Sequence, residues 1–228
     1  MKKRNLKIVL IGTRGVPAKY GGFETCVERI GQVLVQRGHD VTVYCRKSYY
    51  KKKINNYLGM KLVYFPNIKR KSLETLSHTF LCSVHAIFKP SDVSMVFNAA
   101  NSLFILPLKL FGKRIVINTD GLEWKRSKWG RMGRFFYKFS EKLACIVANR
   151  LVSDSEGIRK YYWVNHNTDS TKIAYGADSQ AANSADRLRE FGLKPNEYFL
   201  QVTRFEPENH PLLTIRAFKK IVTDKKLV

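Results

Sequence analysis

The sequence predicts an α/β protein built on a Rossmann-like, doubly wound parallel sheet. Short runs rich in β-branched residues alternate with longer segments of helical periodicity along most of the 228 residues. The first run, residues 8–11, is apolar at every position, as expected of a strand with both faces covered. Phe23, Val27, Ile30 and Leu34 follow at helical spacing. The chain therefore opens with a strand–turn–helix unit.

Six more strands are expected in the same domain, at residues 41–45, 61–65, 92–98, 114–118, 150–153 and 172–175. Helices are expected between them, including residues 102–111 and 131–147. Small polar residues at 178–186 fit a linker. A helix at 185–193, a strand at 198–203 and a helix at 211–222 would then open another domain. We predict an amino-terminal Rossmann-like domain at residues 1–185 and the beginning of a second one at 186–228.

The turn after the first strand is rich in glycine. Such a loop faces the ligand crevice in an open α/β sheet, and Gly21 and Gly22 would let a ligand approach the backbone closely. Glycines between a strand and a helix are also ordinary turn chemistry. Their spacing does not fit the dinucleotide motif G-x-G-x-x-G. The second strand ends in Arg46-Lys47 instead of an acidic residue. This excludes a site that binds the ribose 2′-hydroxyl of NAD and leaves a site that binds the 2′-phosphate of NADP as an alternative.

Two stretches carry a resemblance to a known family: TRGVPAKYGGFETCVER at residues 13–29 and RGHDVTVY at residues 37–44. They are similar to the amino-terminal domain of family 4 glycosyltransferases. Within that family they most resemble the bacterial branch labelled rhamnosyltransferase, whose amino-terminal domain is of the DUF1972 type. The resemblance implies a GT-B architecture, in which an acceptor-side domain and a nucleotide-sugar-binding domain enclose a cleft.

The resemblance also implies an activity. It is the transfer of a sugar, with rhamnose a candidate, from a nucleotide-sugar to a lipid-linked or glycan acceptor in bacterial polysaccharide biosynthesis. Family members retain the anomeric configuration and need no metal or other cofactor. The sequence ends soon after the second domain begins, so that we expect this fragment to be inactive by itself.

The strand at 114–118 leads to Asp120, the candidate catalytic residue. A carboxylate there could accept a hydrogen bond from the attacking acceptor hydroxyl, although Asp-Gly also suits a turn or a helix cap. Trp124 could stack on a sugar or fill a gap in the core. Asn98 could line the crevice or cap the helix that follows. Glu24 would oppose an anion at the start of its helix, and we assign it to shaping the glycine loop.

The loop after the strand at 198–203 resembles the donor diphosphate loop of the family. Arg204 matches the phosphate-binding arginine, and a guanidinium suits bidentate contact with a diphosphate. Asn209 stands where the family commonly has lysine. An amide thus replaces a cation at that position, next to His210, and Asn209 stays with Arg204 as a candidate donor phosphate-binding residue.

The chain carries a formal net charge of +23, which attracts polyanions such as nucleic acid, an anionic membrane or a phosphorylated substrate. Four basic residues share one face of the predicted helix 131–147, whose apolar residues are expected to pack in the core: Arg131, Arg134, Lys138 and Lys142. This basic face is either simply solvated or docks on an anionic membrane. The resemblance supports the second alternative, because family members meet lipid-linked acceptors at the membrane surface.

No apolar run approaches the roughly 18 residues of a membrane span, and residues 8–11 are too few for a signal-peptide core. We therefore expect a cytoplasmic protein, peripheral on the inner face of the plasma membrane. Four scattered cysteines suggest buried thiols instead of disulfides or a metal site. The alternatives to a transferase are a basic nucleic-acid-binding module and an NADP-dependent enzyme. No nucleic-acid motif is found, and no nucleic-acid partner is expected.

Overall fold

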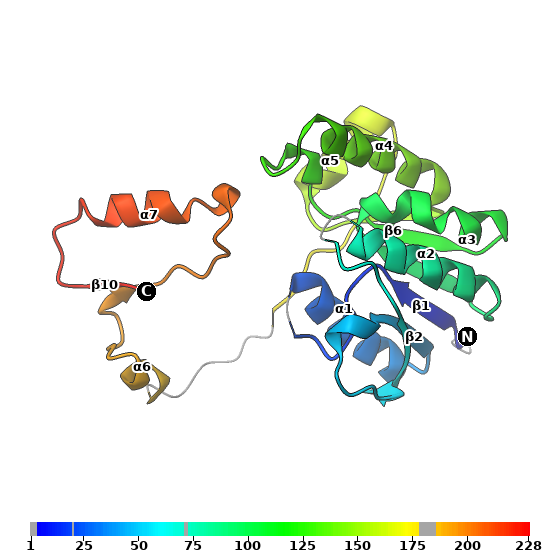
Figure 1. Cartoon of the computed structure of the whole chain (residues 1–228), viewed down its shortest axis with the longest axis horizontal. Coiled ribbons are helices and arrows are strands. Elements are labelled where there is room, and N and C mark those ends of the chain that lie inside the picture. Colours follow the sequence, from blue (N-terminus) through cyan, green and yellow to red (C-terminus); the bar gives the residue numbers. More distant parts are fainter. Residues whose placement is uncertain (1–3, 20, 71–72, 178–185) are drawn as a thin grey trace. The chain divides into compact units, whose positions relative to one another are not determined.

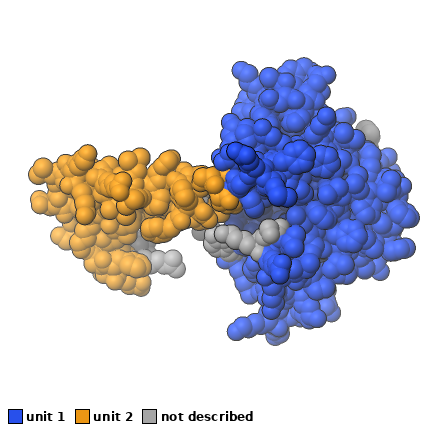
Figure 2. All heavy atoms as spheres, turned by 45° about the horizontal axis from the view of Figure 1, so that its top comes forward, with its two compact units in different colours: residues 1–125, 129–175 blue, residues 126–128, 176–228 orange. Residues whose placement is uncertain are grey.

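The computed structural model describes residues 4–19, 21–70, 73–177 and 186–228. They form two compact units, shown in different colours in Figure 2. Unit 1 comprises residues 1–125 and 129–175, and unit 2 comprises residues 126–128 and 176–228. All but the last residue of the predicted linker at 178–186 lies outside the described residues. The domain boundary at residue 185 stays a prediction.

Unit 1 contains an eight-stranded sheet with the order β3-β4-β2-β1-β5-β6-β7-β8. All its ladders are parallel except the short one between β3 and β4. The strands are β1 Lys7–Ile11, β2 Asp40–Arg46, β3 Asn56–Tyr57, β4 Met60–Phe65, β5 Val93–Phe97, β6 Ile115–Asn118, β7 Arg150–Ser153 and β8 Thr171–Lys172. The predicted doubly wound α/β fold is confirmed.

Helices cover the sheet as the alternation of patterns predicts (Figure 1). They are α1 Gly22–Gln36, α2 Glu74–Ile87, α3 Leu106–Leu110, α4 Arg131–Val147 and α5 Glu156–His166. Three short 3-10 helices lie between them, η1 Lys47–Tyr49, η2 Ala99–Ile105 and η3 Glu123–Lys125. The helix predicted at 102–111 is therefore η2 followed by α3. Pro107 near the start of α3 explains part of this break, because proline is favoured in a first helical turn and not in a helix interior.

Strand β1 shows why the first apolar run does not alternate with polar residues. Val9 and Ile11 belong to a core cluster with residues of α2 to α5. Ile8 and Leu10 belong to the opposite cluster, which contains Val27 of α1. Since both faces of the strand are buried, every position must be apolar.

Unit 2 contains α6 Asp186–Glu190, β9 Tyr198–Phe199, η4 Pro207–Asn209, α7 Pro211–Phe218 and β10 Lys226–Leu227. The predicted order of helix, strand, loop and helix is confirmed, but the bounds are shorter. The strand predicted at 198–203 ends at Phe199, because its parallel partner β10 pairs with only two residues. The helix predicted at 211–222 ends at Phe218.

Candidate functional site

The candidate site lies at the carboxyl ends of β1, β5 and β6. Strand β1 has β2 on one side and β5 on the other, so the chain continues from it to one half of the sheet and later returns to the other half (Figure 1). Ligands of open α/β sheets bind at such a switch point. The glycine loop follows β1, Asn98 follows β5, and Asp120 comes shortly after β6.

The glycine loop passes close to two strands. Gly12 has φ +104°, and a Cβ there would come within 2.5 Å of the Phe97 carbonyl oxygen of β5. Gly15 has φ +110°, and its Cβ would lie 2.5 Å from Cys45 Sγ of β2. Both positions therefore require glycine for the fold itself.

The two glycines expected to face a ligand differ from each other. Gly21 has φ +101° and precedes α1, and a Cβ there would meet the Glu24 carboxylate. Gly22 is the first residue of α1, and no atom lies within 4 Å of the position of its Cβ. The fold therefore explains Gly21, whereas no close contact of the described residues explains Gly22.

Two carboxylates of α1 hold the backbone of the loop. Glu24 is buried, and its Oε1 accepts a hydrogen bond from Arg14 N at 2.9 Å. Glu28 Oε2 accepts one from Ala18 N at 2.7 Å. Glu24 thus contacts the backbone of the loop that we expect it to shape.

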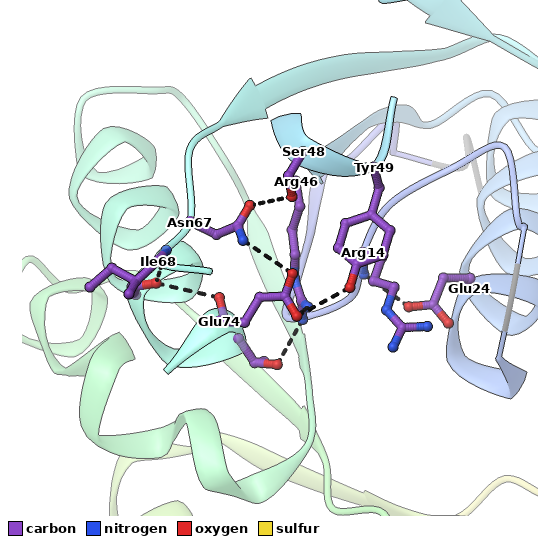
Figure 3. A network of polar contacts seen from close by, with 10 residues as sticks. Arg14, Glu24, Arg46, Ser48, Tyr49, Asn67, Ile68 and Glu74 are labelled. Atoms are coloured by element: carbon purple, nitrogen blue, oxygen red, sulfur yellow. Dashed lines mark hydrogen bonds and ion pairs between the residues drawn. The ribbon is translucent and has the colours of Figure 1, made fainter. Parts of the chain in front are cut away.

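A polar network at the end of β2 supports the same loop (Figure 3). The Arg46 side chain is 5% exposed; its Nη2 donates to Thr75 Oγ1 at 2.8 Å, and its Nη1 lies 3.6 Å from Glu74 Oε2. The Tyr49 hydroxyl donates to the same Glu74 oxygen at 3.1 Å. Arg46 N donates to Arg14 O at 2.9 Å, and the Arg14 guanidinium lies 5.1 Å over the Tyr49 ring. Loop, strand and α2 are therefore joined.

This network weakens the NADP alternative. Arg46 was one of the two cations available to read a 2′-phosphate, but its guanidinium is buried against Glu74 and Thr75. Burial lowers the pKa of Arg46, and the Glu74 carboxylate opposes that effect. Only Lys47 of the pair is exposed.

Asp120 lies among polar side chains from the ends of β5 and β6. It has φ +60°, its N donates to Asn118 Oδ1 at 3.2 Å, and its Oδ2 accepts from Asn98 Nδ2 at 3.4 Å. Asn98 Oδ1 also accepts from Ala100 N at 2.8 Å, which caps η2. Asn98 is thus a cap and a neighbour of Asp120 at the same time. The structure brings these two predicted site residues together.

Two residues of this cluster were not identified from the sequence. The Tyr175 hydroxyl donates to Asn118 Oδ1 at 3.4 Å, and the Tyr175 ring lies edge-on to Phe23 of α1 with centroids 6.3 Å apart. Burial raises the pKa of Tyr175, and the nearby Asp120 carboxylate adds to the rise. Asn118 was the last residue of a predicted strand, but no sequence signal linked Tyr175 to it.

Trp124, in η3, packs against the helices that follow. Lys138 Nζ of α4 lies 4.5 Å over its ring, and Tyr161 of α5 lies at a centroid distance of 6.5 Å. Next to them Glu141 is buried, and its Oε2 accepts from the Tyr161 hydroxyl at 2.9 Å. Lys138 therefore covers one face of the Trp124 ring, and the stacking of Trp124 on a sugar stays a prediction.

Helix α4 has the predicted bounds, and its four basic residues are exposed: Arg131, Arg134, Lys138 and Lys142. The expectation that its apolar residues pack in the core is wrong for several of them. Met132 is 88% exposed, Phe135 74%, Phe139 46% and Ile146 65%. The helix buries small residues and one carboxylate instead: Ser140, Glu141, Ala144 and Val147. Small residues allow a close approach to η2, and the large apolar side chains are left on the outer face.

In unit 2, the loop between β9 and α7 is closed by its own side chains. Asn209 Nδ2 donates to Arg204 O at 3.0 Å, and Glu206 N donates to the same oxygen at 2.7 Å. Arg204 is exposed. Asn209 therefore shapes the loop that presents Arg204, and the phosphate contact of either residue stays a prediction.

The part of the chain that the structure describes contains no candidate metal site and no candidate membrane-spanning helix. Within these residues, no group of three or more His, Cys, Asp or Glu side chains could hold a metal ion. None of the helices in the described ranges is long and apolar enough to span a bilayer. The four cysteines are free thiols, with Cys45 and Cys82 buried.

Comparison with known proteins gives the family. A family model described as "Domain of unknown function (DUF1972)" matches residues 5–178. The chain belongs to this family. A 61-residue segment is also 33% identical to an uncharacterized 42.6 kDa protein in the cps region of Klebsiella pneumoniae, covering 27% of this chain and 16% of that protein.

Several solved structures share the fold of this DUF1972 chain. Sucrose-phosphate synthase from Thermosynechococcus elongatus superposes with a TM-score of 0.80 at 18% identity, covering 98% of this chain and 61% of that one. Anabaena HepE in complex with UDP and glucose superposes with a TM-score of 0.67 at 15% identity, covering 94% of this chain and 58% of that one. Arabidopsis thaliana UGT89C1 complexed with UDP-L-rhamnose superposes with a TM-score of 0.57 at 13% identity, covering 99% of this chain and 69% of that one. The fold is that of GT-B glycosyltransferases, and the chain spans about three fifths of the length of the first two.

Proposed function

We propose that this chain is part of a retaining glycosyltransferase that transfers a sugar from a nucleotide-sugar to a lipid-linked or glycan acceptor. The observation that carries the proposal is the polar cluster of Asp120, Asn98 and Asn118 at the switch point of a GT-B-like sheet. The crystallised neighbours include proteins bound to UDP, to UDP with glucose and to UDP-L-rhamnose. The relative from a cps region supports bacterial polysaccharide biosynthesis as the setting, with rhamnose the first sugar to test.

In this proposal Asp120 orients the acceptor hydroxyl by accepting its hydrogen bond. Gly21 and Gly22 leave room at the start of α1 for the acceptor and the edge of the donor phosphate. Arg204 contacts the donor diphosphate from the loop that Asn209 closes. The reaction requires no metal or other cofactor.

The proposal places the protein on the inner face of the plasma membrane. Arg131, Arg134, Lys138 and Lys142 would lie near anionic lipid headgroups, where each cation is worth about 1 kcal/mol. The exposed Met132 and Phe135 beside them support a helix that lies in the membrane interface, since such helices combine basic and large apolar side chains.

The test replaces Asp120 in the whole protein. We expect Asp120→Asn to lower turnover by about 10²-fold or more with nucleotide-sugar donors, while the melting temperature stays near that of the wild type. Asp40→Asn is the matched control, because Asp40 pairs with Lys61 at the start of β2, away from the crevice. Full activity of the Asp120 variant, or lost stability with unchanged specific activity, would identify the residue as a turn former.

A basic nucleic-acid-binding module is the second candidate, favoured only by the net charge of +23. Binding to nonspecific DNA and to anionic vesicles should be compared across a salt titration. Tight DNA binding at physiological salt, with no binding to vesicles or nucleotide-sugars, would contradict the transferase proposal.

A further inference from the structure

Helices α2, α3 and α4 form one layer on one face of the sheet. Cys82 and Ala86 of α2, Leu108 of α3 and Ala144 of α4 all belong to the same core cluster, with Ile117 of β6 beneath them. Figure 1 shows α2 and α3 side by side, and α4 packs on η2, which leads into α3. The outer faces of the three helices therefore point away from the sheet on the same side.

The ends of α2 and α3 carry a group of protruding apolar side chains. Phe88 is 77% exposed, Leu110 81% and Phe111 63%. Lys113 Nζ donates to Lys89 O at 2.8 Å, which joins the two helix ends. We define the α2–α3 tip as Phe88, Lys89, Lys109, Leu110 and Phe111. Large apolar side chains exposed at two joined helix ends suit an interaction site.

The outer face of this three-helix layer is basic. The tip contributes the exposed Lys89 and Lys109, and α4 contributes its four basic residues. The three helices carry two carboxylates in their described residues, Glu74 and Glu141. Glu74 bonds to Tyr49 and lies 3.6 Å from Arg46, and Glu141 is buried against Tyr161. The outer face therefore offers cations and apolar groups without an exposed carboxylate among the described residues of these helices.

We infer that the α2–α3 tip inserts into an anionic lipid surface, as a second contact beside α4. Phe and Leu side chains next to lysines suit the interface, where the rings enter the acyl boundary and the ammonium groups meet lipid phosphates. A second copy of this chain is a poorer occupant, because two such basic faces would repel each other. The inference rests on the proposed peripheral membrane attachment and widens its contact area from one helix to a three-helix layer.

The experiment measures binding of the 228-residue chain to phosphatidylglycerol–phosphatidylcholine vesicles by co-sedimentation. We expect the triple variant Phe88→Ser, Leu110→Ser, Phe111→Ser to bind at least tenfold more weakly than the wild type at 0.15 M salt. Replacing Lys89 and Lys109 by Glu should weaken binding about fivefold or more per cation at low salt and much less at high salt. All these side chains are at the surface, so the variants should fold, which circular dichroism checks.

Matched variants separate the tip from other surfaces. The control carries Val202→Ser, Phe205→Ser and Val222→Ser in unit 2, at positions 88%, 86% and 103% exposed, and should bind like the wild type. A second readout places tryptophan at position 88 or 222 and adds vesicles of brominated lipid. Extra quenching is expected for Phe88→Trp and not for Val222→Trp.

The outcomes distinguish this inference from the proposed function. Wild-type binding by the triple serine variant, or no extra quenching at position 88, overturns the role of the tip. Met132→Ser with Phe135→Ser then reports separately on attachment through α4. No vesicle binding by the wild type at low salt overturns the tip as well, whereas sugar transfer is decided by the Asp120 variant in its own assay.

Discussion

At the scale of single residues, the glycine loop shows two different reasons for a glycine. Gly12 is fixed by the fold, since a Cβ would come within 2.5 Å of the Phe97 carbonyl oxygen and φ is +104°. Gly22 has open space around it at the amino end of α1. A substitution at position 12 therefore reports on folding, and one at position 22 tests the proposal that a ligand binds next to the loop.

We predict opposite results for the two alanine variants. Gly12→Ala should lower the free energy of unfolding by roughly 1–3 kcal/mol, because it strains the backbone and forces the loop away from β5. Gly22→Ala should stay within about 0.5 kcal/mol of the wild type. Urea unfolding followed by circular dichroism measures both. In the whole protein Gly22→Ala should still reduce sugar transfer, and a fully active variant would show that no ligand approaches Gly22.

At the scale of elements, local patterns predicted most of the fold. The bounds of α4 and β7 agree with the sequence prediction, because periodicity and apolar runs are properties of neighbouring residues. Strand β3 was missed because it is only two residues long. The exposure of Met132 could not be predicted, since the helix face that is buried depends on η2, a distant segment. The contact between Tyr175 and Asn118 joins residues 57 apart for the same reason.

Glu141 connects three elements beneath the outer face of α4. Its carboxylate accepts from the Tyr161 hydroxyl of α5, and Trp124 of η3 lies close to both Tyr161 and Lys138. Burial raises the pKa of Glu141 to about 7, while the Tyr161 hydroxyl and the Trp124 indole favour the ionised form and limit the rise. We therefore expect the stability of the packing of α4 on α5 and η3 to depend on pH.

The pKa of Glu141 gives a signed prediction. The pKa of about 7 in the folded protein exceeds the ordinary value of 4.5, so the folded state holds the proton of Glu141 more tightly than the unfolded state. The stability that this proton provides is complete below pH 4.5 and is lost as the pH rises through 7. The Glu141→Gln variant does not lose this stability, because glutamine does not ionise. The carbonyl oxygen of the glutamine side chain can still accept the hydrogen bond from Tyr161. Relative to the wild type, the variant should gain on the order of 2–3 kcal/mol between pH 4.5 and 8.

Urea unfolding at several pH values measures this gain. Glu190→Gln serves as the control, because Glu190 is exposed on α6 and its replacement should follow the wild-type pH profile. Parallel profiles for the Glu141 variant and the wild type would show that the carboxylate is ionised in the folded protein throughout this range.

At the scale of the whole molecule, the two units differ in what they bury. Unit 1 has two core clusters, one on each face of its sheet. In the described part of unit 2, Leu193 is the only buried hydrophobic residue, and α7 buries none. A strand pair of two residues each and the short helices α6 and α7 do not provide enough apolar burial to offset the loss of conformational entropy.

We therefore predict that limited proteolysis removes unit 2 and leaves unit 1 intact. Trypsin can cut at lysine and arginine throughout the chain, but cleavage requires local unfolding, which costs little where few apolar contacts are lost. Mass spectrometry should show a stable fragment that ends near Tyr175, the last residue of unit 1. Amide hydrogens of α7 should exchange much faster than those of β1, because the helix has no buried side chain to hold it closed. The prediction is wrong if the amides of α7 are as protected as those of β1 and segment 186–228 resists trypsin. Unit 2 would then be stabilised by contacts other than the burial of apolar side chains within this chain.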